Sequence, residues 1–244
     1  MSVDRRLRLW GLAAAYAASG PVTVAHVCAA ATSTTVTDGA AIAVALTATP
    51  RETIYSSDRT ASEIEELSLT LGEGPCVDAL GGTLVLVPDL GTVQSRARWP
   101  VFAPAAVEAG VQAIFALPLR VGAIRLGVLD LYRAGPGELD HEQLLDALML
   151  ADTACALLLD AVDTALPASG RIPESAGLQH PEVHQATGMV SVQLGLSVTL
   201  ALIRLRAYAY VHNRRLRDVA GDVVTHRLRF NPEGSSGNGR SEGD

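Results

Sequence analysis

Arginine residues gather where two amphipathic segments meet in the last third of the chain. Arg206 lies in the first segment, Arg214 and Arg215 lie between the two, and Arg217 begins the second. Guanidinium groups bind phosphate oxygens bidentately and stack on bases that are splayed out of an RNA loop. We therefore predict that these four arginines bind nucleic acid. The competing interpretation is a solvated helix face, which is the usual meaning of a run of charges.

The charge of the chain is divided between two parts. Residues 1–166 hold 10 Arg and 19 acidic residues, a net charge of −9. Residues 178–230 hold seven Arg against three acidic residues, a net charge of +4. An acidic part followed by a basic part indicates two modules with different partners, and any nucleic-acid binding must be local to the basic part. Tyr208 and Tyr210 there could stack on bases, although tyrosines more often pack in a core or a dimer contact.

No group of residues in the sequence has the spacing of a known active site. The chain contains no lysine, which excludes a Schiff base and a Walker-A lysine. The cysteines Cys28, Cys76 and Cys155 are far apart and form no zinc-like pair. His180 and His184 are four residues apart, but no third ligand lies near them in the sequence. We expect no enzymatic activity, no metal and no cofactor.

Residues 72–76 (GEGPC) allow two interpretations each for the loop and for its cysteine. A glycine-rich loop can bind phosphate, but this loop lacks the lysine that such sites require. We therefore favour a turn with positive φ followed by a helix that begins at Pro75. Cys76 could be a redox-sensing thiol at a helix N-terminus. We favour a small buried hydrophobic residue.

The composition is that of a globular chain. Of 244 residues, 48% are hydrophobic and only 4% aromatic, so the core must be built mostly from Ala, Val and Leu. No run of 18 apolar residues predicts a membrane span. Arg5, Arg6 and Arg8 precede an apolar run at 9–18, which has the outline of a signal peptide. We favour an amphipathic first helix and a cytoplasmic protein, because Gly20 and Pro21 end the run early.

Apolar runs and turn residues predict an α+β domain followed by a small all-α one. Residues 22–28 fit either a helix or a strand, and Asp140 with Gln143 forms a capping box for the longest helix. Strands are expected at 40–46, 83–87, 113–119 and 125–132, and helices at 5–18, 62–70, 100–109 and 141–162. Three short helices are expected between 181 and 229, the first ended by Gly195 and the second capped by Ser197.

Segments rich in Gly, Pro and Ser separate and end these modules. Residues 164–177 contain two Pro and two Gly with little apolar periodicity, and we predict a linker there. Residues 231–244 contain no large apolar side chain, and we predict a flexible tail. The expected domains are therefore 1–163 and 178–230.

An ordered string of motifs in the first domain resembles an actinobacterial GAF domain, with its match over 20–163. The resemblance implies a six-stranded antiparallel sheet with helices packed on it, and a module for small-molecule sensing and dimerisation. The Asn-Lys-Phe-Asp-Glu pattern of cyclic-nucleotide GAF domains is absent, so the ligand is unidentified. The motifs are LGEGPCVD at 71–78, VPDL at 87–90, RWP at 98–100, FALPL at 115–119 and RLGVLDLYR at 125–133.

The second domain resembles an ANTAR domain, the RNA-binding module of bacterial transcription antiterminators. The motifs are QATGM at 185–189, LGLS at 194–197 and LRDVA at 216–220, with Ala201, Leu205 and Ala209 between them. Thr187 stands where the family commonly has lysine, so the resemblance implies an RNA contact there that has lost its charge.

The two resemblances together imply a GAF and ANTAR domain-containing regulator. In such a protein the GAF domain senses a ligand or state, and the ANTAR domain binds RNA hairpin loops so that transcription passes a terminator. The alternative is a DNA-binding regulator that uses the three helices as a helix-turn-helix. We also expect a homodimer, because the helix at 141–162 has an apolar stripe longer than one domain needs.

Overall fold

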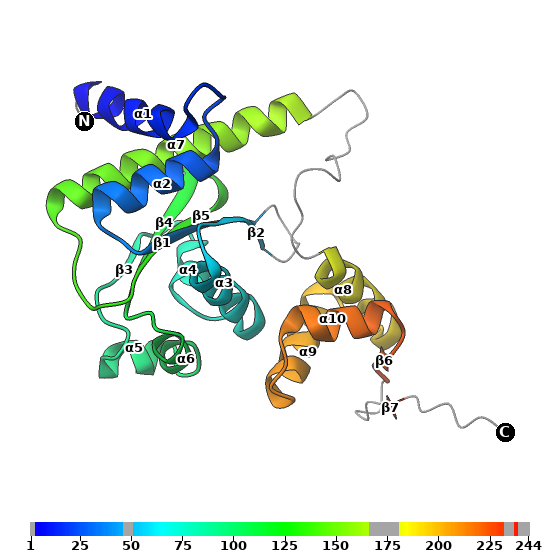
Figure 1. Ribbon diagram of the computed structural model, residues 1–244. Helices are drawn as coiled ribbons and strands as arrows, with labels where there is room; N and C mark the ends of the chain where they lie inside the picture. The colour runs from blue at the N-terminus through cyan, green and yellow to red at the C-terminus, as the bar shows by residue number, and fades with distance from the viewer. Residues whose placement is uncertain (1–2, 46–50, 166–180, 232–236, 239–244) are drawn as a thin grey trace.

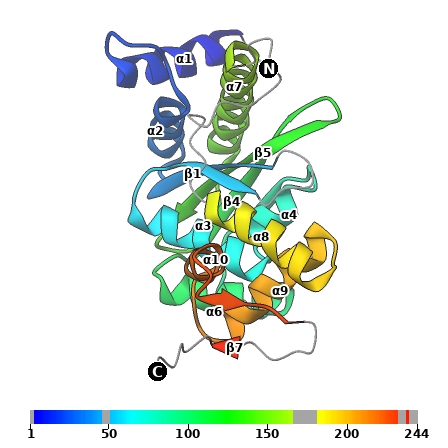
Figure 2. The same cartoon turned by 90° about the vertical axis from the view of Figure 1, so that its right-hand side faces the viewer.

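The computed structural model describes residues 3–45, 51–165, 181–231 and 237–238. These residues form an N-terminal domain of a sheet between two groups of helices, and three C-terminal helices beside it (Figure 1). The C-terminal helices contact the N-terminal domain mainly through helix α3 (Arg59–Leu71), as the side view in Figure 2 also shows.

A five-stranded antiparallel sheet in the order β2-β1-β5-β4-β3 forms the centre of the described N-terminal domain. The long β4–β5 hairpin turns at Gly122, whose φ of +58° suits a glycine in a tight hairpin turn. The strands are β1 (Gly39–Val44), β2 (Glu52–Ser56), β3 (Val85–Val87), β4 (Ala113–Val121) and β5 (Ile124–Arg133).

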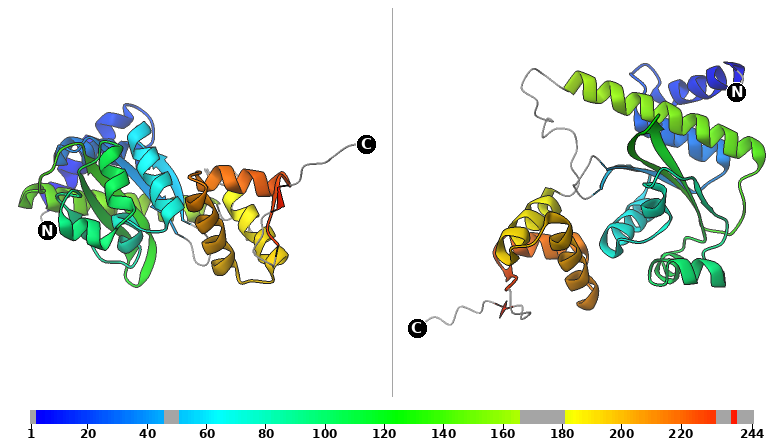
Figure 3. Two further views of the ribbon diagram at one scale, coloured as in Figure 1. Left: turned by 90° about the horizontal axis from the view of Figure 1, so that it is seen from below. Right: turned by 180° about the vertical axis from the view of Figure 1, so that it is seen from behind.

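Helices cover both faces of this sheet, so its side chains alternate between two apolar cores. Phe115 and Leu117 of β4 point to the first core, whereas Ile114 and Ala116 point to the second. The two layers are seen from behind in the right panel of Figure 3. The first core is covered by α1 (Val3–Ala17), α2 (Val24–Thr35) and α7 (His141–Ala165), and the second by α3, α4 (Pro75–Ala79), α5 (Val93–Arg98) and α6 (Phe102–Glu108).

Helix α1 is an integral part of the first core. Leu9 and Ala13 are buried, and the guanidinium of Arg8 lies 2.7 Å from the carboxylate of Asp146 on α7. The amphipathic first helix predicted from the sequence is therefore confirmed in the structure.

The C-terminal helices are α8 (Pro181–Leu194), α9 (Val198–Val211) and α10 (Leu216–Val224). As predicted, Gly195 ends the first at a φ of +64°, and the Ser197 hydroxyl accepts the N–H of Leu200 at 3.3 Å. The helices enclose a small apolar core that consists of Val183, Ala186, Val190, Ala201, Leu205, Ala209, Leu216, Val219, Ala220 and Val223.

No single helix among the described residues is long and apolar enough to cross a membrane. The pair α8 and α9 passes the same criteria only when both helices are counted together across their 105° bend.

Most predicted elements are present, although β2 and α5 were not predicted. The sheet of the described residues has five strands, not the six that the GAF resemblance implied. Residues 24–28, for which the sequence allowed a helix or a strand, belong to helix α2. The predicted linker at 164–177 lies almost wholly outside the described residues. The same holds for most of the predicted tail, although Gly237–Asn238 pairs with Leu228–Arg229 as a two-residue strand, which the tail prediction missed.

Candidate functional site

The four arginines predicted to bind nucleic acid are placed differently in the structure. Arg215 and Arg217 are exposed at the start of α10. Arg214 forms an ion pair, in which its guanidinium lies 2.7 Å from the carboxylate of Asp222. Arg227 binds the second oxygen of the same carboxylate at 2.8 Å, so Asp222 neutralises part of the basic surface.

Arg206 faces the N-terminal domain instead of solvent. Its Nε donates to the backbone carbonyl of Leu69 at 2.9 Å, at the end of helix α3. Burial, together with the positive charge of Arg51, lowers the pKa of Arg206 to about 10. Gly72 ends α3 at a φ of +70°, and a Cβ there would lie 2.9 Å from the Arg206 guanidinium. The backbone conformation therefore favours a glycine here, and a side chain would also displace the Arg206 guanidinium.

Two further contacts complete this docking surface between α3 and the C-terminal helices. The N–H of Leu216, the first residue of α10, donates to the Thr70 hydroxyl at 3.2 Å. Leu69 belongs to the apolar core of the C-terminal helices, although it lies on α3. The docking surface thus combines one apolar side chain with two hydrogen bonds.

Thr187 lies inside the C-terminal bundle. Only 1% of it is exposed, and its hydroxyl donates to the carbonyl of Val183 one turn earlier at 2.6 Å. A side chain at this position is oriented toward the helix core, so Thr187 presents no group to solvent in this arrangement.

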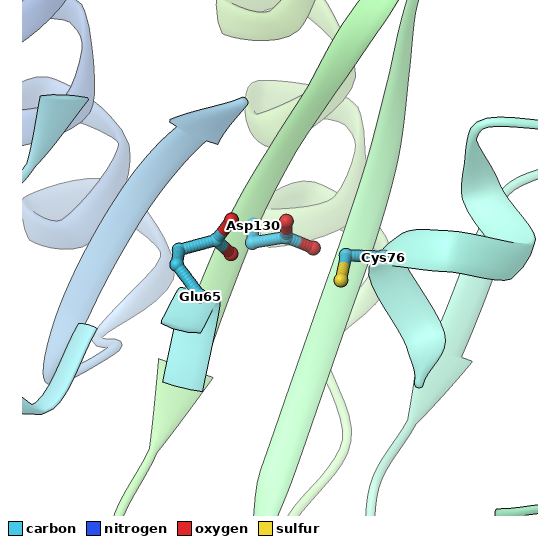
Figure 4. A group of neighbouring side chains, drawn as sticks. All are labelled: Glu65, Cys76 and Asp130. Atoms are coloured by element: carbon cyan, nitrogen blue, oxygen red, sulfur yellow. The ribbon is translucent and has the colours of Figure 1, made fainter. Parts of the chain in front are cut away.

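A second group of polar residues is buried between the sheet and helices α3 and α4. The Arg51 guanidinium donates to the sulfur of Cys76 at 3.0 Å and to the carbonyl of Glu65 at 2.8 Å. It also lies 3.0 Å from the carboxylate of Glu65. The Ser68 hydroxyl lies 2.8 Å from the same sulfur. Figure 4 shows Glu65 and Cys76 on either side of Asp130, which projects from β5.

The electrostatics of this cluster follow from its burial. Burial raises the pKa of the Cys76 thiol well above its usual value, although Arg51 opposes the shift. Burial disfavours the charged guanidinium, but Cys76, Glu65 and Asp130 around it hold the pKa of Arg51 above its usual value. Burial and the neighbouring Glu65 also raise the pKa of Asp130. The Cys76 sulfur is therefore a buried neutral thiol, as the sequence favoured, but it also has polar partners.

The cavity at this cluster is small. Its lining includes Glu65, Cys76, Asp130, Phe102 and Tyr132, and about 10 Å³ is open to the centre of a water molecule. About that much space is the minimum that holds one water. In this conformation the N-terminal domain has room at this place for a water or an ion, not for an organic ligand.

The GEGPC segment serves as a structural turn. Gly74 has a φ of +129° and Pro75 begins α4, as predicted. The carboxylate of Glu73 accepts the N–H groups of Val101 and Phe102 at 2.8 and 2.6 Å, which joins the loop to the start of α6.

Sequence reasoning did not identify Arg51, Glu65 or Asp130 as site residues. One signal was available for Asp130, because it interrupts the apolar strand of residues 126–131 with a charge. The structure describes one of the two imidazoles considered as metal ligands. His180 lies outside the described residues, and His184 is beside the carboxylate of Glu52.

No protein-family model and no curated protein matches the chain. Several solved structures match the chain in fold. The GAF domain of a phosphoenolpyruvate-protein phosphotransferase from Coxiella burnetii aligns with 68% of this chain and 100% of its own, at 14% identity and a TM-score of 0.51. SdiA in complex with octanoyl-rac-glycerol aligns with 92% of this chain and 96% of its own, at 11% identity and a TM-score of 0.50. The similarity to the phosphotransferase GAF domain establishes that the N-terminal domain has a GAF-like fold.

Proposed function

We propose that this chain is an RNA-binding regulator of transcription in which the GAF-like domain senses a signal and the C-terminal helices bind RNA hairpin loops. The observation that carries the proposal is the exposed basic surface at the start of α10, formed by Arg215 and Arg217 on a small helical bundle. The ANTAR-like motifs of that bundle support antitermination as its output. We propose that the chain acts by binding and catalyses no reaction.

The docking surface supplies a way to couple the two domains. With Arg206 held on the carbonyl of Leu69, this arginine is unavailable to RNA. We propose that the signal weakens the contact between α3 and the bundle, and that the released bundle presents Arg206 beside Arg215 and Arg217. A dimer of released bundles would bury apolar surface that the docked bundle places on α3.

The signal is proposed to be small. SdiA was solved with octanoyl-rac-glycerol, but a molecule of that size does not fit the cavity lined by Cys76 and Asp130 as it stands. A change of ionic or protonation state in this cluster needs no larger opening.

RNA binding should depend on the charges of Arg215 and Arg217. Each phosphate neutralised on a single-stranded loop adds roughly 0.7 to the slope of log K against log salt. The double substitution Arg215→Ala/Arg217→Ala should therefore weaken hairpin binding and flatten the slope by about 1.4. Fluorescence anisotropy with a labelled hairpin at several salt concentrations measures both quantities.

The matched control is Arg120→Ala/Arg125→Ala, which removes two exposed arginines from the β4–β5 hairpin. This control should retain both affinity and slope. Equal behaviour of the two double variants would contradict the proposed surface. Duplex DNA that competes better than hairpin RNA would instead support the helix-turn-helix alternative.

Weakening the docking surface should increase RNA affinity. Thr70→Val keeps the side-chain volume but removes the acceptor for the Leu216 N–H, a loss of about 0.5–1.5 kcal/mol. The released fraction, and with it the apparent affinity for hairpin RNA, should rise by up to about 10-fold. Thr153→Val is the control, because its hydroxyl donates to the carbonyl of Met149 within the same helix α7. Unchanged or weaker RNA binding by Thr70→Val would show that docking does not restrain the bundle.

A further inference from the structure

Three potential metal ligands converge inside the N-terminal domain from three separate elements. Glu65 comes from α3, Cys76 from α4 and Asp130 from β5. One ligand atom from each lies within 4.8 Å of the others, and the three residues are 2%, 3% and 7% exposed. Figure 4 shows the carboxylate of Asp130 directed between the other two side chains.

The carboxylate of Asp130 is the least satisfied group in the cluster. Neither of its oxygens receives a hydrogen bond from a donor among the described residues. The Glu65 carboxyl stands beside it, and two carboxylates repel one another unless a proton or a cation lies between them. A buried carboxylate without a donor is costly, so a positive ligand at this position would be stabilising.

The available space matches an ion. The cavity that Glu65, Cys76 and Asp130 line has about 10 Å³ open to the centre of a water molecule. A metal ion with ligands at 2.0–2.3 Å needs no more space than one water.

We propose that Glu65, Cys76 and Asp130 bind one divalent transition-metal ion of the borderline class that includes Zn²⁺. A thiolate with two carboxylates suits such ions, whereas Mg²⁺ and Ca²⁺ prefer oxygen ligands alone. Three protein ligands leave one coordination position of a tetrahedral ion unfilled by these residues. The site can be tested without RNA, and it was not visible in the sequence, where its ligands are 11 and 54 residues apart.

The charges of the cluster balance when the ion is bound. Binding of the metal displaces the protons that the cluster holds, that of the Cys76 thiol included, to solvent, which leaves three anions from Cys76, Glu65 and Asp130. Their three negative charges equal the two of the metal plus the one of Arg51. Arg51 can therefore remain in contact with Glu65 and the sulfur of Cys76.

Binding requires a small closure of the site. Ligand atoms around a tetrahedral zinc ion lie about 3.3–3.7 Å apart, whereas the three ligand atoms here lie within 4.8 Å of one another, so they must approach by at most about 1 Å. Glu65 is one turn before Leu69 on α3, the residue whose carbonyl receives Arg206. A shift of Glu65 would therefore reach the docking surface.

Titration of the metal-free full-length chain with Co²⁺ tests the site. We expect one equivalent to bind, with a near-ultraviolet absorption band from charge transfer between thiolate and Co²⁺. Zn²⁺ should displace the Co²⁺, abolish the band and raise the thermal unfolding midpoint. Mg²⁺ at the same concentration should neither abolish the band nor raise the thermal unfolding midpoint.

Two ligand variants and two controls make the test specific. Cys76→Ser should lose the charge-transfer band, and Asp130→Asn should bind Co²⁺ at least about 10-fold more weakly. Cys28→Ser and Cys155→Ser should retain the band, because both cysteines are buried in the first core on the other face of the sheet. Circular dichroism identifies any variant that does not fold.

The proposal is overturned if the wild-type chain binds neither Co²⁺ nor Zn²⁺, or if the band persists in Cys76→Ser. It is also overturned if Asp130→Asn, folded by circular dichroism, binds both ions as the wild type does. In each of these cases the cluster is a structural network around Arg51 only.

Discussion

Replacing Arg51 with methionine should destabilise the N-terminal domain by about 3–5 kcal/mol. The substitution keeps an apolar stem but removes the only guanidinium that contacts both Glu65 and Cys76 in the described structure. A buried carboxylate that loses its cation is left with an uncompensated charge, and this kind of loss falls in that range. The thermal midpoint, measured in the presence of a chelator, should fall by roughly 10 °C or more.

The chain contains a matched control for this experiment. Arg59 pairs with Glu63 at 2.8 Å on the surface of the same helix α3, and its side chain is 89% exposed. Solvent already stabilises both charges there, so Arg59→Met should leave the midpoint almost unchanged. Similar losses in the two variants would refute the view that burial makes the Arg51 network essential.

Replacing Ala220 with aspartate should unfold the C-terminal helices. Ala220 is 0% exposed in the middle of α10, where it packs in the small core of the bundle. An unpaired carboxylate at this place costs several kcal/mol, and three short helices have little stability in reserve. Helical circular dichroism and hairpin RNA binding should be lost together, while the N-terminal domain retains its own unfolding transition.

The adjacent residue provides the control. Gly221 has open space around the position of a Cβ, so Gly221→Asp adds the same charge on the same helix without burying it. This variant should keep its helices and most of its RNA affinity. Retention of helicity by Ala220→Asp, or equal loss in both variants, would show that the bundle core does not depend on Ala220.

The sequence by itself determined most of the secondary structure and the GAF-like fold of the N-terminal domain, although β2 and α5 were not predicted. The two short apolar runs at 113–119 and 125–132 and the turn at Val121 and Gly122 predict a hairpin, because paired strands joined by a tight turn have this pattern. The capping box of Asp140 and Gln143 is formed as predicted, with hydrogen bonds of 2.8 and 3.0 Å. Local hydrogen bonds and apolar periodicity depend only on neighbouring residues, and for that reason they can be recognised in a single sequence.

The placement of the candidate site residues was decided by tertiary contacts. Arg206 and Arg215 are both arginines on a basic segment, yet one docks on Leu69 and the other faces solvent. No local pattern distinguishes them, because the difference depends on where α3 ends relative to α9.

The same reason applies to the buried cluster. Arg51, Glu65, Cys76 and Asp130 are spread over 80 positions of the sequence, and only the packing of α3 and α4 on β5 brings their polar atoms together. Long-range packing selects one partner for each charged group from many that the sequence allows. The sequence therefore specified the elements and the charge of each domain, and the tertiary structure decided which charges are buried, paired or free to bind a ligand.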